Sequence, residues 1–169
     1  MYLRVGRCRQ TGGELCVRQV QNGLRVAVLP LQTCGEDDLK WAREIVAQDR
    51  AGKPLPFLEE VKAYKLLRLD ALRREHGDKL PLEVHVLRFG SDAAVVTFPG
   101  ELFVELGLAV KQAAPAATTL VVELANSVET IYIPTRKACA EGSYEVTNSM
   151  LQPGSGEMLV EAAVRLLRE

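Results

Sequence analysis

Two apolar runs separated by a helix-length segment constrain this fold most. They cover residues 93–98 and 118–124, and the Pro99-Gly100 turn and an apolar-rich segment over 101–112 lie between them. The first run is nearly unbroken, which is typical of a strand covered on both faces. The second run is expected to be the next central strand. Strand, helix and strand of these lengths predict a βαβ unit over 93–124. The chain is therefore predicted to be α/β, with a mixed sheet flanked by helices.

The segments before this unit predict an N-terminal β region followed by two helices. Residues 1–30 alternate in short stretches, with a turn at Gly12-Gly13 and a hairpin signal at Asn22-Gly23. Acidic residues over 36–38 begin a helix that is expected to run to Gln48, and residues 51–56 form a linker. A second strand pair is expected on either side of a turn at 90–92.

Three further helices are predicted from their apolar periodicity, over residues 57–76, 101–112 and 157–168. In the first, Tyr64 is expected to face the core and Lys65 the solvent. The second is expected to be well buried because it is mostly apolar. In the third, Met158 is expected on the inward face, and Trp41 of the preceding helix is expected to pack against the sheet.

Composition narrows the class of protein. A length of 169 residues predicts that residues 1–169 form one α/β domain with one core. The formal charge of −1, with no Lys/Arg-rich run, predicts no nucleic-acid partner. No apolar run approaches the roughly 20 residues needed to span a bilayer. The first ten residues carry three arginines and no apolar stretch behind them, so we expect a soluble chain without a signal peptide. The sequence predicts no particular cellular compartment.

The cysteines and histidines do not form a metal-binding pattern. The four cysteines lack CxxC spacing, which favours buried or idle thiols over a metal site. Cys8 and Cys16 could face each other across a hairpin, although nothing in the sequence requires it. His76 and His85 have no ligand-like neighbour and are expected at the surface.

Three polar residues at the ends of predicted strands are candidates for chemistry. Glu101 follows Pro99-Gly100 at a predicted helix start, where amide groups favour an ionised carboxylate that could act as a ligand or base. Tyr132 could be a core tyrosine or a phenol aimed into a cleft, and Tyr144 is expected on a flexible loop. Asn126 is expected to close a turn. A purely structural role stays open for each of these four residues. The sequence contains no GxSxG, P-loop or HExxH motif.

Four short motifs resemble those of a known family. They are Phe98-Pro99-Gly100-Glu101, Leu124-Ala125-Asn126, Tyr132-Ile133-Pro134-Thr135 and Tyr144-Glu145. In this order and spacing they resemble the neutral/alkaline (non-lysosomal) ceramidase family, in particular the C-terminal portion of its shorter bacterial members. The similarity is specific over 84–169 and weaker over 1–80. It implies a zinc-dependent amidase (a hydrolase of sphingolipid metabolism) that cleaves the N-acyl bond of ceramide.

The resemblance assigns roles to three residues. It implies that Glu101 and Tyr132 are zinc ligands and that Tyr144 stabilises the transition state. A carboxylate and a phenolate, with two imidazoles, would complete a four-coordinate Zn²⁺ site. The zinc would activate water or polarise the amide carbonyl, and a tyrosine hydroxyl could donate to the developing oxyanion.

The upstream half of the family's site has no counterpart in this sequence. The family's histidine ligands and its serine are missing, and neither His76 nor His85 falls on a ligand position. The resemblance therefore implies the C-terminal part of a larger catalytic domain. Two further zinc ligands would come from an N-terminal portion or a second chain, and the isolated chain would have little or no amidase activity on a lipid-type N-acyl substrate.

Two alternatives stay open. One is a non-catalytic scaffold or assembly domain, which could form a homo-oligomer through an exposed apolar surface. The other is a related hydrolase of a different N-acyl or ester substrate, because no residue selects a ceramide chain over another acyl group.

Overall fold

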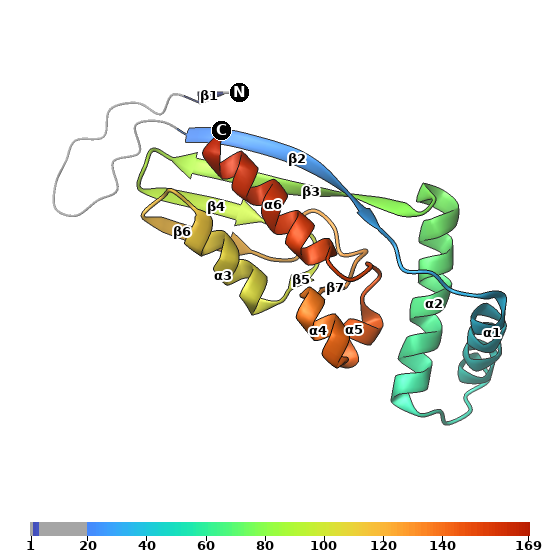
Figure 1. Cartoon of the computed structure of the whole chain (residues 1–169). Coiled ribbons are helices and arrows are strands. Elements are labelled where there is room, and N and C mark those ends of the chain that lie inside the picture. Colours follow the sequence, from blue (N-terminus) through green and yellow to red (C-terminus); the bar gives the residue numbers. More distant parts are fainter. Residues whose placement is uncertain (1, 4–19) are drawn as a thin grey trace.

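The computed structural model describes residues 2–3 and 20–169. Its main sheet has the strand order β1-β2-β3-β4-β6 (Figure 1). The β1–β2, β2–β3 and β3–β4 pairs are antiparallel, and the β4–β6 pair is parallel. The strands are β1 (Tyr2–Leu3), β2 (Val20–Pro30), β3 (Lys79–Phe89), β4 (Ala93–Thr97) and β6 (Thr118–Val122).

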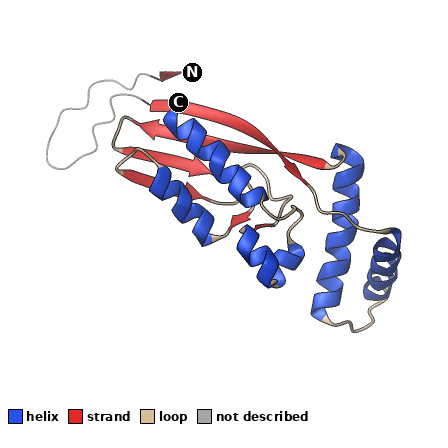
Figure 2. Ribbon diagram, in the orientation of Figure 1, coloured by secondary structure: helices blue, strands red, loops and turns tan. Residues whose placement is uncertain are grey.

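Six helices accompany the strands in the described residues (Figure 2). They are α1 (Glu36–Arg50), α2 (Phe57–His76), α3 (Val104–Ala113), α4 (Arg136–Glu141), α5 (Tyr144–Asn148) and α6 (Ser155–Arg168). Helices α3 and α6 lie side by side over one face of the sheet, and the α1–α2 hairpin lies beyond the end of β2 and β3 (Figure 1). The predicted α/β class is confirmed, including the parallel strand–helix–strand unit over 93–124.

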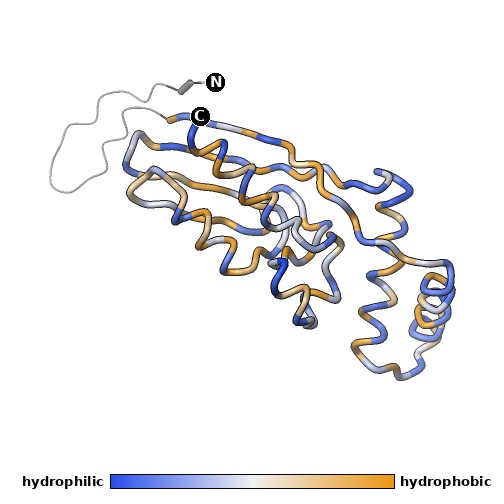
Figure 3. Tube along the Cα trace, viewed as in Figure 1, coloured by the Kyte–Doolittle hydropathy of each residue, from blue (hydrophilic) through white to orange (hydrophobic). Residues whose placement is uncertain are grey.

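The core lies between α6, α3 and the covered face of the sheet. Hydrophobic positions recur along β2, β3 and α6 (Figure 3), as expected for elements that bury one side. A Cβ atom on Gly23 would lie 3.1 Å from Cδ2 of Leu166, so the glycine lets α6 approach the strand closely. Asn22 and Gly23 pair with Leu87 and Val86 within β2. The predicted hairpin at Asn22-Gly23 is therefore wrong.

The other face of the sheet is open and largely apolar. The strand registers place Leu24, His85, Thr97 and Val122 in one row across it. Five of its large apolar side chains are between 42% and 56% exposed; these are Leu24, Val26, Val28, Leu120 and Val122. Strand β6 ends the strand order, so it is an edge strand in the described structure. The expectation that 118–124 forms a central strand is therefore wrong, and the first run, β4, is covered by helices on one face only in the described structure.

The α1–α2 hairpin has its own small core of Ala42, Ile45, Val46, Ala63 and Leu66. Lys65 is buried and donates to Oε1 of Gln32 at 2.6 Å, and burial lowers the pKa of its ammonium group. Tyr64 is exposed, and its hydroxyl donates to Asp49 at 2.7 Å. The expected orientations of Tyr64 and Lys65 are thus reversed, because α2 packs against both α1 and the end of β2.

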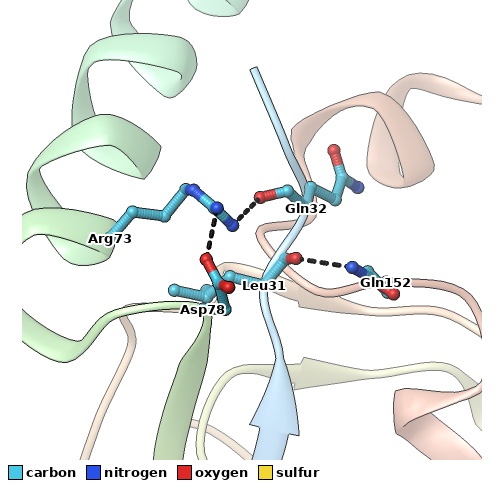
Figure 4. Close-up of polar contacts among 5 residues, drawn as sticks. All are labelled: Leu31, Gln32, Arg73, Asp78 and Gln152. Atoms are coloured by element: carbon cyan, nitrogen blue, oxygen red, sulfur yellow. Dashed lines mark hydrogen bonds and ion pairs between the residues drawn. The ribbon is translucent and has the colours of Figure 1, made fainter. Parts of the chain in front are cut away.

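Polar contacts join this hairpin to the rest of the protein (Figure 4). The Arg73 guanidinium donates to the Gln32 carbonyl at 3.1 Å and pairs with Asp78. From the other side, Nε2 of Gln152 donates to the Leu31 carbonyl at 3.0 Å. The segment after β2 is therefore held between α2 and the residues that precede α6.

Several predicted side-chain positions differ from those observed. Trp41 is partly buried within the helical hairpin rather than against the sheet, and Nζ of Lys62 lies 5.3 Å from its ring centroid. Met158 is exposed, as are Val104 and Leu108 of α3. Met158, Val104 and Leu108 are exposed because α3 and α6 each bury only one stripe of side chains. The apolar content of a helix does not show where that stripe lies.

Two sequence expectations lie outside the described residues: the Gly12-Gly13 turn and the Cys8–Cys16 pairing. Cys34 and Cys139 are free thiols. None of the helices in the described part of the chain is long and apolar enough to cross a membrane.

Candidate functional site

Two predicted site residues stand opposite each other on a small parallel sheet. It consists of β5 (Glu101–Leu102) and β7 (Tyr132–Ile133), with Glu101 in register with Tyr132 and Leu102 with Ile133. Leu102 and Ile133 are buried, so the alternation along each strand places Glu101 and Tyr132 together on the less buried side. The fold thus brings together a carboxylate and a phenol that are 31 positions apart in the sequence.

The Pro99-Gly100 turn holds this pair in place. The Glu101 amide donates to the Ile131 carbonyl at 2.7 Å, and the Gly100 amide donates to the Ser127 carbonyl at 3.0 Å. Helix α3 begins at Val104 with Phe103 as its N-cap. The prediction that Glu101 begins the helix is wrong, because its backbone pairs with β7 instead.

The segment between β6 and β7 is conformationally strained. Leu124, Asn126 and Ile131 have φ angles of 53°, 71° and 56°, in the left-handed region that L-residues rarely occupy. Asn tolerates this region better than most other residues, so the backbone conformation at Asn126 is less strained than at Leu124 and Ile131. The Leu124 amide donates to the Gly100 carbonyl at 3.0 Å, which ties the strained segment to the Pro-Gly turn.

Tyr144 is the first residue of α5 rather than a loop residue, which corrects the sequence prediction. Its helix is capped by Ser143, whose hydroxyl accepts from the Val146 amide at 3.3 Å. The Tyr144 ring lies edge-on to the Tyr132 ring with centroids 6.1 Å apart, and it stacks on Phe57 at 6.2 Å. The three predicted site residues therefore converge, and Phe57 joins them from α2.

Acidic side chains surround the two phenols. Burial raises the pKa of Tyr132, and the nearby Glu101, Tyr144 and Glu145 raise it further. Burial is also the main cause that raises the pKa of Glu123, with the charge of Glu101 adding to it. A hydrogen bond from Ser143 lowers the pKa of Glu145.

Sequence reasoning missed Glu123 and gave Glu145 no role. The position of Glu123 directly after β6 could have identified it, because the carboxyl ends of parallel strands are where α/β proteins build sites. Glu145 follows Tyr144 in α5, and its proximity to Tyr132 depends on how that helix packs against β7.

The oxygen atoms of Glu101 and Tyr132 are of the type that zinc accepts. The nearby negative charges disfavour ionisation of the Tyr132 hydroxyl, and a bound cation would counteract them. Within residues 2–3 and 20–169, no three His, Cys, Asp or Glu side chains are grouped so as to hold a metal ion. His85 lies on the open face of the sheet beside Glu83, and His76 ends α2. Glu101 and Tyr132 are therefore two oxygen donors in register, and the described residues provide no grouped set of further acidic, thiol or imidazole ligands.

Two cavities adjoin this cluster. One has a volume of about 690 Å³ and lies between the α1–α2 hairpin and α5; its lining includes Trp41, Leu58 and Tyr144. The other has a volume of about 520 Å³, and Glu145 lines it together with residues of α3 and α4. Tyr144 therefore lines one cavity beside the site, and Glu145 lines the other.

The fold is similar to part of a neutral ceramidase. The crystal structure of neutral ceramidase from Pseudomonas aeruginosa matches 88% of this chain with a TM-score of 0.52 and 15% sequence identity. The match covers 28% of that chain, so this chain spans just over a quarter of its neighbour's length. At this identity the likeness shows the fold alone. No protein-family model and no curated protein matches the sequence.

Replacing Gly100 should destabilise the site. Gly100 has a φ of 81°, and a Cβ atom there would lie 2.2 Å from Oγ1 of Thr130 and 2.9 Å from the Ile131 carbonyl oxygen. Gly100→Ala should therefore lower the free energy of unfolding by roughly 3 kcal/mol, measured by urea denaturation. Gly52 has a similar φ of 72° with open space around it, so Gly52→Ala should cost only about 1 kcal/mol. If both substitutions lowered the free energy of unfolding equally, the predicted clash with Thr130 at position 100 would be contradicted.

Removing the Glu101 charge should make Tyr132 easier to ionise. In the metal-free chain, Glu101→Gln should move the pKa of Tyr132 part of the way back toward 10.0, because burial remains the larger cause of the shift. Phenolate absorbance during an alkaline titration measures this, and Tyr132→Phe in each background isolates the Tyr132 signal. A titration curve unchanged by Glu101→Gln would show that the two groups do not interact.

Proposed function

We propose that this chain supplies half of the metal site of a ceramidase-like zinc amidohydrolase that hydrolyses N-acyl amide bonds. The observation that carries the proposal is the register of Glu101 with Tyr132, with the Tyr144 ring beside them. The motifs that suggested these residues are far apart in the sequence, and coincidental motifs would have no reason to meet on one small sheet.

Each residue has a defined role in this proposal. Glu101 and Tyr132 would hold the zinc ion, which when bound supplies Lewis-acid activation of an amide carbonyl or of water. Tyr144 would donate its hydroxyl hydrogen to the oxygen that becomes negative as the amide is attacked. The oxygen pair needs two further ligands from outside this chain. We therefore expect the isolated chain to bind zinc poorly and to show little or no amidase activity.

The test uses the longest polypeptide that the gene encodes around this sequence. Glu101→Ala and Tyr132→Phe should each remove bound zinc, measured by elemental analysis, and reduce fatty-acid release from an N-acyl amide on the order of a hundredfold or more. Tyr144→Phe should reduce release about a hundredfold while zinc is retained. Glu161→Ala, at an exposed position on α6 outside both cavities, serves as the matched control. Unchanged zinc content and hydrolysis in both ligand variants would refute the assignment.

The open sheet face supports a second candidate role in assembly. Aliphatic side chains of β2 and β6 are about half exposed there, on a sheet with a parallel strand pair, and parallel pairs are usually covered on both faces. A second polypeptide layer would cover this face, either from another copy of the chain or from the remainder of a larger catalytic domain.

Mass in solution distinguishes these arrangements. If copies pair through the sheet face, the chain should be a dimer by light scattering, and Val26→Asp should convert it to a monomer because a carboxylate cannot be buried cheaply. Leu108→Asp, at a similarly exposed position on α3, should leave the dimer intact. A wild-type monomer at all concentrations would rule out self-assembly through this face.

A further inference from the structure

We propose that the α1–α2 hairpin is a movable cover over Tyr144, fixed at the C-terminal half of α2 and able to swing at the N-terminal half. The two halves of this 20-residue helix are attached to the protein in different ways. One half is buried in the main core, and the other meets α5 at an exposed aromatic contact. A rotation about the buried half therefore displaces the exposed half together with α1.

The C-terminal half of α2 is fixed. Leu69 and Leu72 are buried members of the main core, at 0% and 1% exposure. Arg73 follows them, and its guanidinium donates to the Gln32 carbonyl at 3.1 Å and pairs with Asp78. Side chains in a close-packed interior cannot shift without their neighbours, so this half of the helix moves with the main sheet.

The N-terminal half of α2 belongs to the core of the hairpin. Ala63 and Leu66 pack against side chains of α1, in a core that is separate from the main core in the described residues. Cys34 packs against both cores, so the boundary between them lies at the segment between β2 and α1. A unit with a core of its own can swing as one body without losing its internal packing.

The start of α2 meets α5 where Phe57 stacks on Tyr144, with ring centroids 6.2 Å apart. Phe57 and the neighbouring Leu58 are each 64% exposed, and Tyr144 is 37% exposed. Water already reaches most of the Phe57 surface, so little additional apolar area becomes hydrated when the stack opens. The free-energy cost of opening is therefore small compared with the cost of withdrawing Leu69 from the main core.

A cavity next to the stack gives the hairpin room to move. It has a volume of about 690 Å³, and Trp41 and Leu58 line it on the side of the hairpin. A swing toward α5 narrows this cavity and removes apolar surface of the hairpin from water. A swing away uncovers the Tyr144 ring, which lies edge-on to Tyr132. The position of the hairpin therefore determines how accessible the candidate site is.

The consequence for hydrolysis rests on the proposed function, because Tyr144 is the residue that the hairpin covers. Under that function, opening admits the substrate and closing excludes water from the reacting group. The motion itself requires neither zinc nor substrate, so it can be measured separately.

The test follows Trp41, which is the only tryptophan in the sequence and lines the cavity on the side of the hairpin. The whole 169-residue chain is prepared with 5-fluorotryptophan at this position and without zinc. Fluorine NMR relaxation dispersion detects exchange between environments on the microsecond to millisecond scale, where lid motions occur. We expect two environments, of which the less populated one corresponds to the open hairpin.

Substitutions identify the contact that keeps the hairpin closed. Phe57→Ala and Tyr144→Ala should each raise the ratio of open to closed hairpin about fivefold, and the double variant should raise it no further. Tyr144→Phe keeps the ring and should leave the ratio unchanged. Leu108→Ala, at an exposed apolar position on α3, is the matched control and should also leave it unchanged.

Hydrogen exchange distinguishes movement of the hairpin from its unfolding. If the hairpin swings as one body, the amides of α1 and of the first half of α2 should keep their wild-type protection in Phe57→Ala. Loss of this protection would show that the hairpin unfolds and would overturn the proposal.

Two further results would contradict the movable hairpin. One is a fluorine signal without exchange in both the wild-type chain and Phe57→Ala, and the other is an equal effect of Leu108→Ala. If the exchange responds as expected while the zinc and hydrolysis tests fail, the proposed function is wrong and the movable hairpin stands. If the zinc and hydrolysis tests succeed and no exchange is found, the proposed function stands and the movable hairpin is wrong.

Discussion

The site depends on the pairing of two dipeptides, Glu101–Leu102 and Tyr132–Ile133. Two short strands cannot hold each other in place by their own hydrogen bonds, because such a ladder is too short to offset the entropy of ordering it. The Pro99-Gly100 turn supplies the missing order, since Gly100 both donates to and accepts from the segment between β6 and β7. The burial of Leu102 and Ile133 then anchors the pair in the core, and Glu101 and Tyr132 remain together on its surface.

The α1–α2 hairpin determines what lies beside this pair. Its polar contacts with the main body include the segment after β2. There Arg73 donates to the Gln32 carbonyl, Lys65 donates to the Gln32 side chain, and Gln152 donates to the Leu31 carbonyl. Lys65 is costly to bury, so its hydrogen bond matters for keeping this segment ordered. Helix α2 also meets α5 directly, where Phe57 stacks on Tyr144. The cavity beside Tyr144 is lined by residues of α1, α2 and α5, so the placement of the hairpin determines its shape.

The sheet is completed on one side only. Helices α3 and α6 supply one covering layer, while the opposite face presents the aliphatic side chains of β2 and β6 to solvent. If Glu101 and Tyr132 hold zinc as proposed, the pair at β5–β7 would need further ligands in a similar way, because two oxygen donors do not fill the coordination shell of zinc.

The sequence by itself determined the fold class and the longer regular elements. Periodicity identified helix 57–76 and the strand–helix–strand unit over 93–124, because apolar spacing directly reflects which side of an element is buried. Motif spacing also selected Glu101, Tyr132 and Tyr144, which the fold brings together. Only tertiary structure decided that Asn22-Gly23 continues a strand, that Lys65 is buried and that β6 is an edge. Each of these depends on a partner distant in the sequence, and a local pattern shows that a residue is buried without showing what buries it.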